Sequence, residues 1–452
     1  MRTVDVAVVG AGVAGLAAAR ELQRRAPNLS FTVLEARARI GGRIFTERVA
    51  GLPHPIELGA EFVHGTAPET IKVATSAGLM LCDVRGERWQ SANNGRLTPF
   101  RDFWKRLDSV MRRLDPERSP DRSFMDFLAT KPGGKTLARE RALALEFVQG
   151  FHAADPTRIS ERSLAAGGSP GEDPNEQRMA RVLDGYDRVP HTLAATVSDH
   201  IALETVVSRI AWRRGDVRLT STRQDGSVDS VRARAAIVTV PLGVLLAPSG
   251  ERGSIAFEPA IDRVLAHARG LAMGSVLRIT LRLHERFWED LPIRLPRGTS
   301  LNALSFLHTR DEDVPVWWTT HPIRAPLIVG WAGGPRATRL LNCSVSEIER
   351  RATLSLARQL GIDVRTIRRV VEQVWMHNWD HDPFTRGAYS YGLVGGDDAP
   401  RDLARPVEQT LFLAGEAADP EGRLGTVNGA IATGVRAAKA CVRTLNGAKV
   451  AR

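Results

Sequence analysis

Three glycines and one carboxylate in this chain have the spacing of a dinucleotide-binding turn. Gly10, Gly12 and Gly15 form the pattern GxGxxG, and Glu35 follows 20 residues after Gly15. In this pattern the first glycine permits a tight turn, the second lets the backbone approach a pyrophosphate, and the third lets a helix pack closely on a strand. A carboxylate at the position of Glu35 can accept hydrogen bonds from a ribose. These four residues predict a site for phosphates and a ribose.

The segments around these residues have the periodicity of the βαβ unit that such a site requires. Residues 4–9 and 31–34 are apolar runs typical of strands buried on both faces, and residues 16–24 are rich in Ala and Leu and predict a helix. The N-terminus of that helix would offer free N–H groups and a partial positive charge to a phosphate. Because strands, glycines, helix and acid agree, a βαβ unit without a nucleotide is the weaker interpretation.

Two later segments also combine glycines with polar side chains. Gly42 and Arg43 follow soon after the acid, where a glycine pair allows another close backbone approach and an Arg can bind phosphate oxygens through paired hydrogen bonds. Residues 56–65 read IELGAEFVHG, so Glu61 and His64 are polar groups in an otherwise apolar stretch. For Glu61 alone, a solvated strand end is an equally good interpretation.

The segment 410–430 repeats the combination of strand, glycine, acid and helix start. Residues 410–414 predict a buried strand, Gly415 and Glu416 follow it, and a helix is expected to open at Gly425. The N-terminus of that helix is a second place where negative charge is favoured.

The composition is that of an ordinary globular protein. The chain has 452 residues, enough for two domains, with 43% hydrophobic and 25% charged residues. Its net charge is +11, but the basic residues are scattered along the chain and mixed with 51 acidic residues. Arg is much commoner than Lys along the whole chain. This distribution does not indicate nucleic-acid binding. His377 and His381 are four residues apart, but Pro383 argues against a helix there, so no metal site is predicted.

Cysteine usage and hydropathy predict a cytoplasmic protein. Cys82, Cys343 and Cys441 are far apart in the sequence and form no CxxC motif, which indicates a reducing compartment. The first strand is expected by residue 4, which leaves no room for a signal peptide, and no apolar run is long enough to span a membrane.

The order of the segments predicts two interleaved domains. We expect a discontinuous nucleotide-binding domain and a substrate-binding domain that interrupts it twice. Helices are expected at 103–114 and 137–151, a surface loop at 165–177, a strand at 201–210, and a helix that opens with a capping box at Ser344 and stops at Gly361. The expected nucleotide-binding pieces are residues 1–75, 195–273 and 405–452, and the expected substrate-binding pieces are residues 76–194 and 274–404.

These segments resemble the flavin-containing amine oxidase superfamily along nearly the whole chain. The matching motifs occur in the family's order, which is far more specific than any one of them. After the nucleotide unit and its GGR they are LGAEFVHG at 58–65, VTVPLGVL at 238–245, GSVLRI at 274–279, GAYSY at 387–391, and LAGEA with GTVNGA between 413 and 430. The resemblance implies an α/β fold with a doubly wound FAD-binding domain and an interleaved α+β substrate domain. Among its members, the motifs are most similar to those of polyamine oxidases.

The resemblance also implies which residues bind FAD. Val207 matches the position whose backbone meets the adenine, and Glu416 matches the acid that binds the ribityl chain. Some relatives attach the flavin through a Cys where this chain has Ala388, so the bound FAD is expected to be non-covalent. The expected cofactor residues are Gly10, Gly12, Gly15, Glu35, Ala36, Arg37, Gly42, Arg43, Leu58, Gly59, Ala60, Val207, Trp379, Gly415, Glu416, Gly425, Thr426, Val427 and Ala430.

The chemistry that the family implies is oxidation of an amine. A hydride passes from the carbon beside the amine nitrogen to flavin N5, the imine hydrolyses, and oxygen reoxidises the flavin with formation of peroxide. The expected partners are therefore a small-molecule amine and oxygen or another electron acceptor. The expected catalytic residues are Arg278, Tyr389, His64, Glu61 and Thr426.

The substrate is less well indicated than the chemistry. Phe62 stands where amino-acid oxidases carry an Arg for the substrate carboxylate, which disfavours an α-amino acid, although another Arg could take that role. Of the two tyrosines that face the ring in monoamine oxidases, only Tyr389 is matched, and Thr426 occupies the second position. In polyamine oxidases the counterpart of His64 meets the amine chain. A basic protein fits a polycation poorly, although Glu61 could offset the charge locally.

Arg278 departs from the family pattern and leaves two alternatives open. The family places a Lys there, which holds a water near flavin N5 and assists the reaction with oxygen. An Arg keeps the positive charge, but it is planar and effectively never deprotonated. The first alternative is an FAD-dependent dehydrogenase or desaturase with an acceptor other than oxygen. The second is a flavin-bound protein with little turnover.

Overall fold

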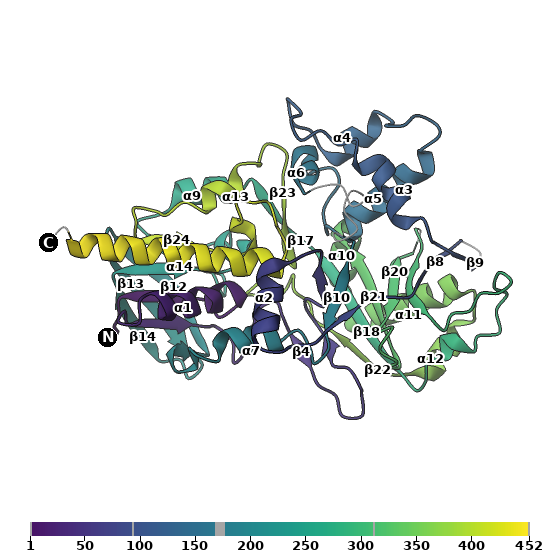
Figure 1. Cartoon of the computed structure of the whole chain (residues 1–452), viewed down its shortest axis with the longest axis horizontal. Coiled ribbons are helices and arrows are strands. Elements are labelled where there is room, and N and C mark those ends of the chain that lie inside the picture. The colour runs from purple at the N-terminus through teal and green to yellow at the C-terminus, as the bar shows by residue number, and fades with distance from the viewer. Residues whose placement is uncertain (1, 93–94, 168–176, 311, 451–452) are drawn as a thin grey trace.

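The computed structural model of the chain describes residues 2–92, 95–167, 177–310 and 312–450. Figure 1 shows two halves side by side along the long axis, each built on β-sheet. Helices α1 (Val13–Arg25) and α14 (Val427–Val450) lie in one half, and α11 (Val345–Leu360) and α12 (Val364–Val370) lie in the other. The chain passes back and forth between the halves, so each is assembled from separate stretches of sequence.

A five-stranded parallel sheet forms the centre of the first half. Four of its strands are buried because they consist mostly of Val, Ala, Ile, Leu and Phe and are covered on one face by α1 and α14, whereas the edge strand Ile201–Ala202 is only partly buried. Gly434 of α14 lies against the backbone of Ala14, so the two helices touch without side chains between them. The strand order is β11 (Ile201–Ala202), β3 (Phe31–Leu34), β2 (Val6–Val9), β15 (Ala235–Val238) and β24 (Leu411–Leu413).

A second sheet, with two parallel and two antiparallel pairings, packs beside the parallel one. Its order is β1 (Arg2–Thr3), β14 (Val228–Ala233), β13 (Asp216–Arg223), β12 (Thr205–Arg213) and β16 (Ala256–Glu258). The prediction of one strand over 201–210 is wrong, because the chain divides there into β11 and β12. Glu204 between them has a left-handed backbone (φ 51°), which turns the chain from the parallel sheet into this one.

The second half is built on a seven-stranded sheet. One face packs on α10 (Gly334–Leu341), α11 and α12, and β18 shows how the strands achieve this. Leu277, Ile279 and Leu281 join the apolar core on that face, while Val276 and Arg278 alternate to the opposite face. The order is β22 (Val371–Met376), β18 (Val276–Leu283), β21 (Leu327–Gly333), β20 (Val316–Thr319), β19 (Leu304–His308), β8 (Glu87–Ser91) and β9 (Leu97–Pro99).

The cap of α11 follows the prediction in part. Ser344 accepts a hydrogen bond from the backbone of Glu347, and Gly361 ends the helix with a left-handed backbone. The carboxylate of Glu347 does not complete a capping box, since it binds Arg350 and Arg351 instead.

Four helices lie above the seven-stranded sheet in Figure 1. They are α3 (Phe103–Met111), α4 (Phe124–Ala129), α5 (Ala138–Gly150) and α6 (Glu161–Ala166). The helix expected over 103–114 thus ends at Met111. Of the loop expected at 165–177, the first two residues belong to α6, and residues 168–176 lie outside the described residues.

Smaller elements link the two halves. A three-stranded sheet joins β6 (Phe62–His64), β10 (Met179–Val182) and β7 (Leu81–Asp83), and two-stranded pairs join β17 (Leu271–Gly274) to β23 (Tyr389–Gly392) and β4 (Thr46–Glu47) to β5 (Ile56–Glu57). The remaining helices are α2 (Pro68–Ser76), α7 (Arg188–Ala194), α8 (Leu242–Leu245), α9 (Asp262–Ala268) and α13 (Ala399–Leu403). None of the described helices combines the length and apolar composition needed to cross a lipid bilayer.

Candidate functional site

A cavity of about 1520 Å³ is lined by residues of both halves. Sites for one small ligand usually measure about 300–1,000 Å³, so this cavity has room for a cofactor and a substrate together. Every residue expected in the site lines it except Gly15. The lining residues among them are Gly10, Gly12, Glu35, Ala36, Arg37, Gly42, Arg43, Leu58, Gly59, Ala60, Glu61, His64, Val207, Arg278, Trp379, Tyr389, Gly415, Glu416, Gly425, Thr426, Val427 and Ala430.

The glycine-rich turn opens one end of this cavity. Gly10 has a φ of 100°, which side chains rarely allow. A Cβ on Gly12 would meet no atom within 4 Å, whereas a Cβ on Gly15 would lie 1.9 Å from the carbonyl oxygen of Gly10. Gly12 therefore leaves free space, and Gly15 permits contact between helix and turn. Helix α1 starts at Val13 without a side-chain cap, so its first N–H groups are available to an anion.

Glu35 ends β3 beside this turn. Its carboxylate accepts hydrogen bonds from the backbone N–H groups of Ala11 (2.7 Å) and Arg37 (2.9 Å), and burial raises its pKa. The guanidinium of Arg37 is turned to Asp382, with an Nη2 to Oδ1 distance of 2.6 Å. At this end of the cavity the Glu35 carboxylate forms no ion pair with the described residues. The Arg37 guanidinium, in contrast, is already paired with Asp382.

Arg43 and Glu416 bind one another at the centre of the cavity wall. Arg43 Nη1 donates to Glu416 Oε1 (2.8 Å) and to the carbonyl oxygen of Ala388 (2.9 Å). Glu416 Oε2 accepts from the Ser390 hydroxyl (2.5 Å) and from the N–H of Gly425 (2.8 Å). Burial alone would raise the pKa of Glu416, but the Arg43 charge and these bonds hold it below its ordinary value. The pair fixes three distant segments around the cavity.

The second helix N-terminus also faces the cavity. The Thr426 hydroxyl accepts from the N–H of Gly429 (2.9 Å) and donates to the carbonyl of Arg423 (2.8 Å). Thr426 therefore caps α14, which begins two residues later than expected, at Val427. Its hydroxyl is already hydrogen-bonded, which is a structural role that the sequence analysis had not assigned.

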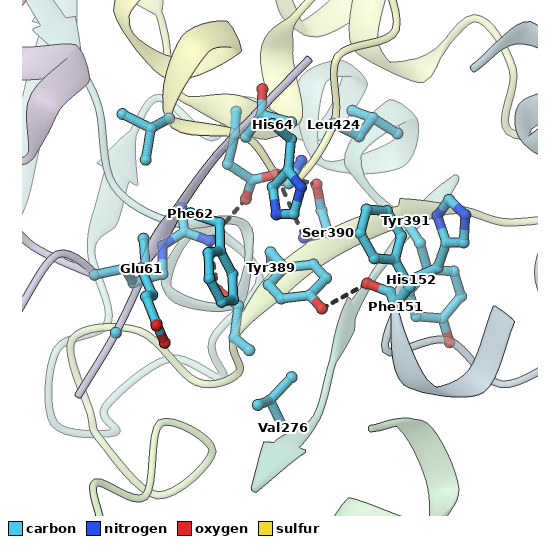
Figure 2. A pocket seen from close by; sticks show the side chains of 18 of the residues that line it. Glu61, Phe62, His64, Phe151, His152, Val276, Tyr389, Ser390, Tyr391 and Leu424 are labelled. Carbon is cyan, nitrogen blue, oxygen red and sulfur yellow. Dashed lines mark hydrogen bonds and ion pairs between the residues drawn. The ribbon is translucent and has the colours of Figure 1, made fainter. Parts of the chain in front are cut away.

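Tyr389 and His64 both line the cavity and are seen in the same part of it in Figure 2. The Tyr389 hydroxyl donates to the carbonyl of Phe151 (2.7 Å), and its ring lies against Gly425, where a Cβ would approach it to 3.0 Å. Tyr391 also lines the cavity, but its ring belongs to the core among the helices. On the neighbouring wall the Trp379 indole donates to the carbonyl of Leu58 (2.9 Å), which anchors the segment that leads to Gly59 and Ala60.

His64 is a neutral imidazole near neutral pH. Its side chain is exposed to the open cavity, and desolvation by the surrounding protein lowers its pKa to about 4. The rings of Phe62 and Phe151 lie 5.8 Å and 5.3 Å from it, edge to face. No hydrogen bond to either of its ring nitrogens is formed by the described residues. His152, which the sequence analysis missed, lies beside Phe151, and burial lowers its pKa to about 4 as well.

Glu61 forms a buried cluster with two arginines, which we call the Glu61 cluster (Arg181, Glu61 and Arg278). Arg181 Nε donates to Glu61 Oε1 (2.5 Å), and Arg278 Nη1 lies 2.7 Å from Glu61 Oε2, which also accepts from the Trp318 indole (3.1 Å). Burial alone would raise the pKa of Glu61, but Arg278 and Arg181 lower it to about 2. The cluster therefore holds one negative and two positive charges.

This cluster corrects the expectation for Glu61. Both of its carboxylate oxygens are occupied and its charge is already compensated, so Glu61 does not offset the positive charge of the cavity. Arg278 lines the cavity but is turned to this acid, and its Nε has no hydrogen-bond partner among the described residues. Arg181 was missed. A charge inside the apolar strand Met179–Val182 was the available signal, since a buried Arg requires a partner.

Aromatic side chains surround the guanidinium group of Arg88 in another part of the cavity wall. The guanidinium carbon of Arg88 lies 4.9 Å from the ring centre of Phe306, 5.2 Å from Trp104 and 5.3 Å from Phe103. His308 stacks on Phe103 at 5.1 Å, and burial together with the Arg88 charge lowers its pKa to about 3. We call these five residues the Arg88 pocket. The sequence analysis singled out none of them.

Comparison with known proteins agrees with this geometry. The family described as flavin containing amine oxidoreductase matches residues 13–442. Probable polyamine oxidase 4 of Arabidopsis thaliana is 27% identical over 97% of this chain and 87% of its own length. Lysine-specific histone demethylase 1 homolog 3 of the same plant is 28% identical over 96% of this chain, but the chain spans only 29% of that protein.

Solved structures show the same fold. The wild-type putrescine oxidase bound to putrescine has a TM-score of 0.79 at 21% identity, with 98% of this chain and 99% of that chain covered. Cyclohexylamine oxidase from Brevibacterium oxydans has a TM-score of 0.77 at 24% identity, with the same coverage. Since the family match covers nearly the whole sequence, the chain belongs to the flavin containing amine oxidoreductase family and is an enzyme of that class.

Proposed function

We propose that this enzyme binds FAD non-covalently in the cavity and oxidises an amine at the carbon next to its nitrogen. The observation that carries the proposal is the continuity of the cavity. It runs from the open N-terminus of α1 and the free space at Gly12, past Glu35 and Gly425, to Tyr389 and His64. These residues fit the successive parts of FAD, with phosphates at α1, a ribose at Glu35 and the ring near Tyr389.

The absence of a cysteine from the described wall supports non-covalent binding. No cysteine is among the described lining residues, and Ala388 stands next to Tyr389. The three cysteines are free, which also supports our proposal of a cytoplasmic location.

When bound, the flavin would supply a hydride acceptor for the substrate carbon. Tyr389 is held by the Phe151 carbonyl and would fix the substrate against the ring. His64 is neutral, and its ring nitrogens have no partner among the described residues, so one of them is available to accept a hydrogen bond from the substrate amine. Phe62, Phe151 and Trp331 line the cavity beside them and provide an apolar wall at this position.

The proposal is tested with the purified protein. We expect a flavin absorbance spectrum, complete release of the colour on acid precipitation, and bleaching of that colour by an amine under anaerobic conditions. Colour that remains in the pellet would contradict non-covalent binding. A coloured protein that no amine in a broad panel bleaches would favour a different electron donor or a flavin-bound protein without turnover.

We expect the reduced enzyme to react slowly with oxygen, because Arg278 binds Glu61 and presents no compact ammonium group. The variant Arg278→Lys should accelerate reoxidation by about tenfold, which corresponds to about 1.4 kcal/mol in the barrier. Stopped-flow mixing of reduced enzyme with air-saturated buffer measures this rate. The matched control is Arg181→Lys, since Arg181 binds the other oxygen of Glu61 but does not line the cavity. Equal rates in wild type and Arg278→Lys would contradict the prediction.

A further inference from the structure

Arg88 is a cation without a carboxylate partner in the wall of the substrate cavity. No acidic side chain of the described residues forms an ion pair with it, and the rings of Phe103, Trp104 and Phe306 lie around its guanidinium group. Such rings contribute about 0.5–2 kcal/mol each, less than a carboxylate does in a buried site. Burial lowers the pKa of Arg88 to about 10, so it stays charged near neutral pH.

Strand geometry directs this charge into the cavity. Arg88 lies on β8, where side chains alternate between the faces of the sheet. Trp89 is fully buried in the core on the far face, whereas Arg88 and Gln90 line the cavity. Arg88 also stands opposite Phe306 in the pairing of β8 with β19, which explains why the two side chains meet.

No acidic side chain in this part of the described wall is free to bind a cation in the way that Arg88 is free to bind an anion. Among the described residues that line this part of the cavity, Glu61 is bound by two arginines, and Glu146 binds Arg336 at 2.9 Å. His308 beside Arg88 is neutral. The uncompensated charge in this part of the described wall is therefore positive, so a second ammonium group on the substrate would meet repulsion here rather than a partner.

We propose that Arg88 binds a carboxylate of the substrate, so that the enzyme oxidises an amine that carries a carboxylate at a distance from the amine. This inference rests on the proposed function for the amine end. The guanidinium provides the planar pair of N–H donors that matches a carboxylate, and the aromatic rings of the Arg88 pocket hold it in place and suit an apolar linker.

The strand spacing of the seven-stranded sheet limits the distance between the amine end and the carboxylate end of the substrate. From β18, which carries Arg278, to β8 there are four strand spacings, or about 19 Å between backbones at about 4.8 Å each. The guanidinium of Arg88 lies over the ring of Phe306 on β19, which is one strand nearer to β18 than β8 is. The linker is therefore shorter than this span. Phe62 and Phe306, with ring centres 6.3 Å apart, form the wall between the two ends.

Binding without turnover tests the anion site directly. Hexanoate and hexanol are titrated calorimetrically into the purified holoenzyme and its variants. We expect hexanoate to bind, and Arg88→Met to weaken its binding by about tenfold or more, as for the loss of charge-assisted hydrogen bonds. Arg310→Met is the matched control, because Arg310 lines the same cavity but donates to the carbonyl of Arg139. It should change the affinity less than about twofold, within the range of ordinary surface substitutions.

Anaerobic flavin bleaching tests the substrate class. Aminohexanoate with its amine on the terminal carbon, hexylamine and diaminohexane are compared with wild type and Arg88→Met, together with shorter and longer members of each series. We expect the amino acid series to react fastest in wild type, and Arg88→Met to slow aminohexanoate far more than hexylamine, so that the preference is lost. A diamine that reacts faster than the matched amino acid would overturn the proposal, as would hexanoate binding that Arg88→Met leaves unchanged.

The two arms separate this inference from the proposed function. If hexanoate binding depends on Arg88 but no amine bleaches the flavin, the anion site stands and the proposed function fails. If amines bleach the flavin without preference for a carboxylate, the proposed function stands and the anion site fails. Thermal unfolding checks that the variants are folded. If Arg88→Met is not, Arg88→Lys replaces it, with weaker hexanoate binding expected because the paired donors are lost.

Discussion

Replacing Glu61 by Gln is expected to lower the free energy of unfolding by about 3–5 kcal/mol, because it leaves two buried guanidinium groups without a counter-charge. Glu61 and Arg278 are 6% and 5% exposed, and Arg181 is 1% exposed, so water cannot replace the lost carboxylate. Urea unfolding of purified wild type and variant measures the difference.

Glu57→Gln is the matched control for this substitution. Glu57 is equally buried, but burial raises its pKa to about 8, so it is protonated near neutral pH. An amide can reproduce its bonds to Thr46 and to the backbone of Tyr186, and we expect a change below about 1 kcal/mol. Similar losses for both variants would show that the Glu61 cluster is not a charge-compensated unit. Adding Arg278→Met to Glu61→Gln should recover part of the loss.

The same cluster predicts the acid sensitivity of the fold. The pKa of Glu61 falls from an ordinary value of 4.5 to about 2 in the folded protein. The unfolded chain therefore binds the proton more tightly, so the contribution of Glu61 is fully present above about pH 5 and is lost as the pH falls towards 2. In Glu61→Gln, stability should decrease less steeply over this range than in wild type.

Gly12→Ala is expected to weaken FAD binding by at least about tenfold while leaving the fold intact. Gly12 has φ −69° and ψ 174°, which Ala adopts without strain, and a Cβ there meets no protein atom within 4 Å. The methyl group would instead occupy the space in which a phosphate approaches the backbone. Each charge-assisted hydrogen bond lost is worth about 1.5–3 kcal/mol. Flavin retention on dialysis and the melting temperature of the flavin-free protein measure the two effects.

Gly15→Ala provides the opposite case three residues later. A Cβ there would lie 1.9 Å from the carbonyl oxygen of Gly10, so the turn must shift and the flavin-free protein should itself be destabilised. If Gly12→Ala kept wild-type flavin affinity, or destabilised the flavin-free protein as much as Gly15→Ala, the phosphate would not lie at Gly12.

Local patterns in the sequence were sufficient for the parts of the site that come from one short stretch. The βαβ unit from β2 to Glu35 needs only buried strands, three glycines and an acid, and each is visible within about 30 residues. The start of α11 at Ser344 and its end at Gly361 are also local, because a cap is formed by residues of adjacent turns.

Partners that come from distant segments could not be read from the sequence in the same way. Glu61 and Arg181 are 120 residues apart and meet only because β6 pairs with β10. Arg88 faces the cavity because β8 pairs with β19, which follows it by more than 200 residues. Arg is so common in this chain that neither residue stands out, and their roles depend on strand register and on which face is buried.

The pairing of β24 with β15 has a consequence for the synthesis of the protein. The ribosome delivers β2, β3 and β15 long before Leu411–Leu413, and α14, which covers α1, comes later still. At about 5–20 residues per second, the nascent chain carries an incomplete parallel sheet with an open edge for many seconds. Such an edge can pair with another chain, so molecular chaperones and a lower growth temperature should increase the yield of correctly folded enzyme.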